Sequence, residues 1–188
     1  MAVQPVAHRF TVDDYYRMAD AGILGADERV ELLQGEIIEM APIGSHHAAC
    51  VRQLSRLFHQ QLGGRAIVSV QDPVRLDDLS EPQPDVALLR PRPDDYAGAH
   101  PTPGDVLLLV EVGDTTAAWD ARHKLPLYAA AGVGEVWLVN LVAGAVEVCL
   151  RPEGGAYTDR RSFGPEAGVA PEAFPDVVID VGDLLPPA

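Results

Sequence analysis

Residues Asp105-Val-Leu-Leu-Leu-Val-Glu-Val112 decide the fold, because this run is apolar almost throughout. Such a run is typical of a central strand that is covered on both faces. Residues 118–131 follow with a helical pattern that ends at Gly132, and residues 135–140 are a second buried strand. The order strand, helix, strand predicts a crossover in which the two strands lie parallel.

Shorter elements are predicted on both sides of this unit, which gives an α/β fold with residues 1–188 in a single domain. Residues 45–62 carry apolar side chains at helical spacing and stop at Gly63-Gly64, so they predict the longest helix. The other expected elements are a helix from Thr11 to about residue 22, a hairpin over 29–40 around Gln34-Gly35, strands at 66–70, 74–76 and 85–90, a loop over 91–104, a C-terminal hairpin over 146–161 and a closing strand at 177–181.

The composition excludes several classes of protein. A net charge of -14 over 188 residues argues against a protein that holds nucleic acid by bulk electrostatics. Cys50 and Cys149 are the two cysteines, so a disulfide scaffold and a Cys-rich zinc site are excluded. No apolar run of about 18 residues and no signal-peptide pattern occurs, so we expect a cytoplasmic protein without a membrane segment.

Two acidic residues lie at the ends of neighbouring predicted strands. Asp85 follows Pro84, and Glu111 lies near the end of the apolar run. Their carboxylates can converge on Mg²⁺ or Mn²⁺, with the backbone carbonyl of Val112 as a third ligand. Such a metal would bind phosphate and lower the pKa of a bound water, while the ammonium of Lys124 orients that water or shields charge. The sequence therefore contains a candidate site for phosphodiester hydrolysis.

Several short motifs, taken in order, resemble the Uma-type restriction endonucleases of the PD-(D/E)xK nuclease superfamily. They are Gly35-Glu36 with Pro42 and His47, Gln83-Pro84-Asp85, Leu109-Val-Glu-Val112, Asp120-x-x-x-Lys124-x-x-x-Tyr128 and Ala131-Gly-Val-Gly-Glu-Val-Trp-Leu-Val139. The resemblance covers roughly residues 10–150 and implies a restriction-endonuclease-like αβββαβ core with a mixed sheet. It also implies that Asp85 and Glu111 are metal ligands and that Lys124 is the catalytic lysine. Lesser members of the site would be Glu36, His47, Asp114 and Asp120.

The chain departs from the superfamily pattern in two places. The superfamily places its lysine two residues after the glutamate, where this chain has Gly113, so the role passes to Lys124. A Ser-Pro turn is expected after the Glu-Val pair, but Gly113-Asp114-Thr115 stands there instead. Asp114 could either reach the metal or disrupt the metal site.

The helix over 45–62 also carries the one basic stripe of the sequence. Arg52, Arg56 and His59 fall on one side of it, and residues 45–65 contain no acid. The two arginines could contact DNA phosphates, and the alternative is an ordinary polar helix face.

The function expected from these features is a Mg-dependent DNA endonuclease. One such site cuts one strand, so we expect a homodimer. Two alternatives stay open. One is an inert nuclease-fold module for interaction or structure, in which Lys124 is only the salt-bridge partner of Glu111. The other is a metal-dependent hydrolase of a different phosphate substrate.

Overall fold

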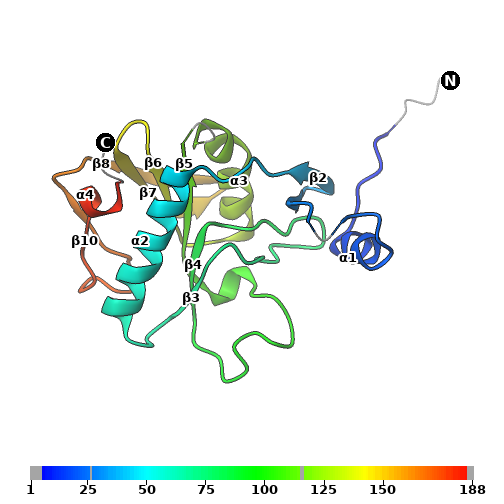
Figure 1. Cartoon of the computed structure of the whole chain (residues 1–188), viewed down its shortest axis with the longest axis horizontal. Coiled ribbons are helices and arrows are strands. Elements are labelled where there is room, and N and C mark those ends of the chain that lie inside the picture. Colours follow the sequence, from blue (N-terminus) through cyan, green and yellow to red (C-terminus); the bar gives the residue numbers. More distant parts are fainter. Residues whose placement is uncertain (1–5, 26, 115–116, 186–188) are drawn as a thin grey trace.

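The computed structural model describes residues 6–25, 27–114 and 117–185. Its centre is a six-stranded mixed sheet with the strand order β3-β4-β5-β6-β7-β8 (Figure 1). In chain order the elements are α1 (Val12–Asp20), β1 (Val30–Leu33), β2 (Glu36–Glu39), α2 (Ser45–Leu62), β3 (Ile67–Ser69), β4 (Val86–Leu89), the 3-10 turn η1 (Pro103–Asp105), β5 (Val106–Gly113), α3 (Ala117–Ala131), β6 (Glu135–Asn140), β7 (Ala145–Glu153), β8 (Ala156–Phe163), β9 (Gly168–Val169), β10 (Ile179–Asp180) and α4 (Val181–Leu184).

The predicted crossover is present in the central sheet. Strands β5 and β6 run parallel, with Val110 opposite Trp137, and α3 connects them. The other neighbouring pairs of this sheet are antiparallel. The order α2-β3-β4-β5-α3-β6 is the αβββαβ core, so the predicted fold class is confirmed.

Helices cover both faces of the sheet. On one face α2 packs Leu54 and Phe58 into the same buried cluster as Leu108 and Val110 of β5. On the other face Leu109 shares a buried cluster with side chains of α3. Side chains alternate along a strand, so Glu111 points to the same side as Leu109, toward α3. This alternation directs the acidic residue of the central strand toward the helix that carries Lys124.

The hairpin of β1 and β2 confirms the predicted turn at Gln34-Gly35. Both turn residues have positive φ angles, 51° and 76°, as a tight two-residue hairpin turn requires. Gly35 is also needed for space, because a Cβ atom there would lie 2.7 Å from the Cβ of Arg9. The hairpin docks on the loop before β4, since the N–H of Glu81 donates to the carbonyl of Leu32 at 2.8 Å. That loop leads directly to Asp85.

Two predicted strands are wrong in detail. Residues 74–76 form no strand, because Val74 and Leu76 donate their N–H groups to Pro82 and Ser80 within a local loop. Residues 177–181 are extended only over Ile179–Asp180, after which the chain turns into the short helix α4. In the described part of the chain no helix is long and apolar enough to cross a membrane.

Candidate active site

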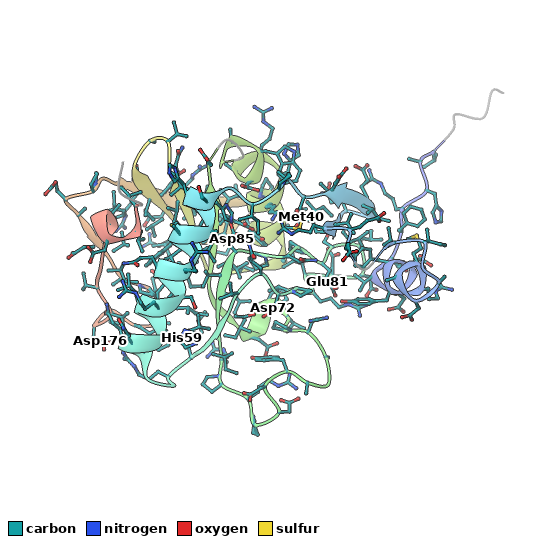
Figure 2. All side chains as sticks on the ribbon, in the orientation of Figure 1. Met40, His59, Asp72, Glu81, Asp85 and Asp176 are labelled. Carbon is teal, nitrogen blue, oxygen red and sulfur yellow. The ribbon has the colours of Figure 1, made fainter. Side chains whose placement is uncertain are left out.

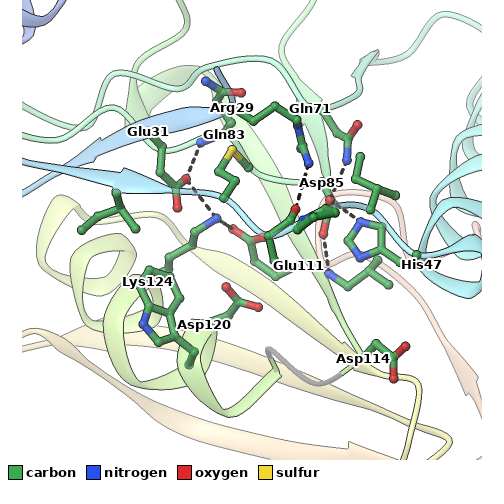
Figure 3. Close-up of a pocket in the computed structure, with 18 of the residues that line it drawn as sticks. Arg29, Glu31, His47, Gln71, Gln83, Asp85, Glu111, Asp114, Asp120 and Lys124 are labelled. Atoms are coloured by element: carbon green, nitrogen blue, oxygen red, sulfur yellow. Dashed lines mark hydrogen bonds and ion pairs between the residues drawn. The ribbon is translucent and has the colours of Figure 1, made fainter. Parts of the chain in front are cut away.

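A pocket of about 400 Å³ opens between the small hairpin, the central sheet and the helices α2 and α3. Its wall comes from the β1–β2 hairpin, the segment that follows it and the start of α2. Its floor comes from Asp85 just before β4, from the end of β5 and from α3, and Figure 3 shows the side chains that line it. Glu31, Asp85, Glu111, Asp120 and Lys124 line the pocket, and all five are buried. Acidic groups therefore outnumber the ammonium in a region largely withdrawn from water.

The strand register brings Asp85 and Glu111 into this pocket. Strands β4 and β5 are antiparallel, with Val86 opposite Val110 and Ala87 opposite Leu109. Asp85 directly precedes β4, so the same register places it across from Glu111. Opposite residues of an antiparallel pair project to the same face of the sheet. The start of one strand and the end of the next thus place both carboxylates at one edge.

Asp85 is held by three hydrogen bonds. Its Oδ1 accepts from the His47 ring at Nε2 (2.8 Å) and from Nε2 of Gln71 (3.1 Å). Its Oδ2 accepts from the backbone N–H of Val112 at 2.8 Å. The hydrogen bond to this carboxylate raises the pKa of His47. The backbone N–H of Val112 therefore takes part in the site, and Asp85 is oriented before anything binds.

Glu111 contacts two groups of α3. The hydroxyl of Tyr128 donates to Oε1 of Glu111 at 2.5 Å, and Nζ of Lys124 lies 3.3 Å from the same oxygen. Burial raises the pKa of Glu111 strongly, the Lys124 ammonium opposes this rise, and the negative charge of Asp85 adds to it. Burial, with the nearby acids adding to it, thus makes ionisation of Glu111 costly despite the contact with Lys124.

Lys124 lies between two carboxylates. Its Nζ is 3.1 Å from Oε2 of Glu31 and 3.3 Å from Oε1 of Glu111 (Figure 3). Burial alone would lower the pKa of Lys124, but the carboxylates of Glu111, Glu31 and Asp120 outweigh burial and raise it. Lys124 therefore stays protonated at neutral pH. It can stabilise negative charge or orient water, but it cannot act as a general base.

The structure separates the lesser candidate residues into two groups. His47, Asp114 and Asp120 line the pocket, Asp114 as an exposed residue next to the end of β5. Glu36 does not line it, because it lies at the turn end of the hairpin and pairs with Arg9 at 2.8 Å. Gly113-Asp114-Thr115 stands where the Ser-Pro turn was expected, and of these residues Thr115 lies outside the described part of the chain.

The candidate DNA contacts lie on α2, outside the pocket. Arg52 and Arg56 are exposed, and Arg56 donates to the side chain of Gln53 at 2.8 Å. His59 lies further along the helix, on the side of Asp176 and away from Asp85 (Figure 2). The stripe therefore runs away from the pocket mouth along an open helix face.

The pocket is lined by carboxylate oxygens, which are the donors that Mg²⁺ and Mn²⁺ prefer. Within the described residues, no three His, Cys, Asp or Glu side chains are grouped so as to hold a metal ion. Two carboxylates, Asp85 and Glu111, line the pocket beside Val112. Mg²⁺ commonly uses one or two carboxylates and completes its shell with water and substrate phosphate. The described residues thus offer oxygen donors of this kind but no three-residue metal cluster.

Two residues of this site were missed as functional candidates from the sequence. Glu31 is not among the candidate site residues predicted from the sequence, yet it is buried and ion-paired to Lys124. Tyr128 belongs to the motif with Asp120 and Lys124 but has no predicted role of its own, yet its hydroxyl donates to Glu111. A signal existed for each. Glu31 interrupts the apolar arm over 30–33, and Tyr128 lies four residues after Lys124, on the same helix face.

Known proteins are similar to this chain in both sequence and fold. Residues 12–182 match the model of the Uma2 family, described as "Putative restriction endonuclease". A crystal structure of a "putative nuclease belonging to DUF820" from Anabaena variabilis ATCC 29413 superposes with a TM-score of 0.73 at 16% identity, over 93% of this chain and 97% of that one. At such an identity the likeness shows the fold alone. No curated protein matches the chain. The family match spans most of the sequence, and the chain therefore belongs to the Uma2 family of restriction endonuclease-like proteins.

Proposed function

We propose that this chain is a Mg²⁺- or Mn²⁺-dependent endonuclease that hydrolyses phosphodiester bonds in DNA, with Asp85, Glu111 and Lys124 as its catalytic residues. The observation that carries the proposal is the meeting of these three side chains in one pocket, with Lys124 ion-paired to Glu111 at 3.3 Å. Membership of a family of restriction endonuclease-like proteins supports the reaction class.

Each residue has a role that follows from its surroundings. Asp85 and Glu111 would hold the ion through carboxylate oxygens, beside the backbone of Val112. A bound divalent ion supplies a Lewis acid for the phosphate and a water of lowered pKa. Lys124 keeps its proton, so its ammonium stabilises the negative charge that develops on the phosphate. Tyr128 fixes the orientation of Glu111 through its hydroxyl.

DNA binding would use the exposed face of α2. Arg52 and Arg56 are the candidate phosphate contacts, because both are exposed and residues 45–65 contain no acid in a chain with a net charge of -14. A single site cleaves one strand, so we propose a homodimer for cleavage of a duplex. A sedimentation measurement of the purified protein tests the dimer independently of activity.

A plasmid assay tests the proposed reaction. Supercoiled DNA is incubated with purified protein and Mg²⁺ or Mn²⁺, and nicked and linear products are expected. Chelator should abolish the products, and so should Asp85→Ala or Glu111→Gln. Glu36→Gln serves as the matched control, because this acid on the neighbouring hairpin is exposed and outside the pocket. Folded wild-type protein that leaves the plasmid intact with both metals would contradict the proposal.

An inert module is the second candidate, and one observation favours it. Lys124 already has two carboxylate partners, so this cluster can exist as a structural ion-pair network without a metal. The two functions differ in metal binding. If the chain is a nuclease, wild type should bind Mn²⁺ through Asp85 and Glu111, and Asp85→Ala should bind it more weakly. If the cluster is a structural network, wild type and Asp85→Ala should both bind Mn²⁺ negligibly.

A further inference from the structure

We infer that Glu31 is a positioning residue for Lys124, which holds the ammonium so that Glu111 is available to a divalent cation. The inference rests on the proposed metal-dependent function and adds a residue that belongs to a separate sheet. Glu31 lies on β1 of the small hairpin, whereas Glu111 lies in the central sheet and Lys124 on α3. The three meet only in the folded chain.

Glu31 is itself fixed from two directions. Its Oε2 accepts the backbone N–H of Gln83 at 3.1 Å, in addition to the ion pair with Lys124 at 3.1 Å. The side chain of Gln83 returns a hydrogen bond to the carbonyl of Val30, next to Glu31, also at 3.1 Å. Gln83 stands two residues before Asp85. The same small network therefore fixes the backbone just before Asp85 and also the Glu31 carboxylate that faces Lys124.

The ion pair between Lys124 and Glu31 affects whether Glu111 can exchange the Lys124 ammonium for a cation. Lys124 lies between Glu31 and Glu111, at nearly equal distances from the two carboxylates (Figure 3). A cation that binds Glu111 weakens the attraction of Lys124 to that side, and the ammonium can then rest on Glu31. Without Glu31, the buried Lys124 would keep its ion pair with Glu111, and the ammonium would compete with the cation for that carboxylate.

This competition gives a measurable effect on metal affinity. Glu31→Gln keeps the shape of the side chain and an acceptor for the Gln83 N–H, but it removes the charge that holds Lys124. We expect it to weaken Mn²⁺ binding by about tenfold or more, the range found when a residue behind a metal ligand is changed. Titration of the folded protein with Mn²⁺, followed by calorimetry or by electron paramagnetic resonance of the free ion, gives the affinity without reference to activity.

A double-mutant cycle separates positioning from a direct effect of charge. In a Lys124→Met background there is no ammonium to hold, so adding Glu31→Gln should change Mn²⁺ affinity by less than about twofold. If Glu31 instead acts on the cation directly, the second substitution weakens binding as much as it does in wild type, and the inference is overturned. Glu36→Gln, on the same hairpin but outside the pocket, should leave the affinity unchanged.

The remaining outcomes are equally decisive. Wild type that binds Mn²⁺ while Glu31→Gln binds it just as tightly overturns the inference and leaves the proposed function standing. Wild type that binds no Mn²⁺ removes the proposed function and the inference together. Should Glu31→Gln fail to fold, Glu31→Asp replaces it. Its shorter side chain keeps the charge but withdraws it from Lys124, so weaker Mn²⁺ binding is expected and an unchanged affinity overturns the role of Glu31.

Discussion

The backbone N–H of Val112 donates a hydrogen bond of 2.8 Å to Oδ2 of Asp85. Val112 directly follows Glu111, so the residue beside one candidate metal ligand holds the other in place. The contact joins the end of β5 to the start of β4, where the antiparallel register already sets the two acids across from each other. The site is thus preorganised by backbone geometry as well as by side-chain partners.

Asp85→Ala is expected to lower the free energy of unfolding by roughly 1 to 3 kcal/mol, because it leaves the buried Val112 N–H without its acceptor. Charge repulsion between the two acids alone would predict no loss, or a slight gain. The three hydrogen bonds to Asp85 make the loss the expected result. Urea denaturation measures the change, and Glu36→Gln, an exposed acid, should stay within about 0.5 kcal/mol of wild type. Equal midpoints for Asp85→Ala and wild type would contradict this account.

Metal binding is expected to release protons from the pocket. Burial and the neighbouring acids raise the pKa of Glu111, so part of the protein holds a proton there at neutral pH, and a cation must displace it. Calorimetric titration with Mn²⁺ in two buffers of different ionisation enthalpy measures the number released. The released fraction should fall as the pH is raised, because more Glu111 is already ionised. A binding enthalpy that is the same in both buffers would exclude proton displacement.

Neutralising the stripe on α2 should weaken DNA binding in a salt-dependent way. If Arg52 and Arg56 each contact a phosphate, the double substitution to Gln makes the slope of log affinity against log salt less steep by about 2. Fluorescence anisotropy of a labelled duplex, titrated at several salt concentrations between about 50 and 200 mM, measures this slope. Arg160→Gln is the control, since Arg160 pairs with Glu147 on the β7–β8 hairpin. An unchanged slope in the α2 variant would remove this face from the DNA interface.

The central fold could be predicted from sequence because its signals are local. The apolar run of β5, the helical spacing of α2 and the turn at Gln34-Gly35 each fix an element within a few residues. The prediction of a strand over 74–76 was wrong because a short β-prone stretch does not show which backbone groups it will pair with. Val74 pairs with Pro82 in its own loop, and no local pattern distinguishes such pairing from a place in the sheet.

The candidate site could be predicted only in part, because contacts between distant segments leave no local pattern in the sequence. Asp85, Glu111 and Lys124 stand out by their setting in strands and in a spaced motif, and the structure brings them to one pocket. The family resemblance implied that Glu36 lies near them, but Glu36 stands at the turn end of the hairpin and does not line the pocket. Glu31 faces Lys124 instead. Which arm of a hairpin meets a distant helix depends on docking between two sheets, and sequence spacing does not encode that contact directly.

Glu135 provides a test of stability against pH away from the pocket. It is buried at the start of β6, where its carboxylate accepts from Nε1 of Trp137 and from the backbone N–H of Glu172, both at 2.7 Å. Burial raises the pKa of Glu135 from 4.5 to about 7, against the opposing effect of these hydrogen bonds. Between these two values the folded protein binds the proton and the unfolded chain does not. Stability therefore falls as pH rises through this window, by roughly 3 kcal/mol at most.

Glu135→Gln should remove this part of the pH dependence. The variant is expected to be less stable than wild type at pH 5, because an amide cannot accept both hydrogen bonds, but to lose less stability on going to pH 8. The pKa of Glu111 is also raised in the folded protein, so the stability of the variant should still fall somewhat as the pH rises. Urea denaturation at half-unit steps of pH gives both curves, and Glu153→Gln, an exposed acid of β7, is expected to follow wild type. Parallel curves for wild type and Glu135→Gln would mean that Glu135 is ionised in the folded protein throughout this range.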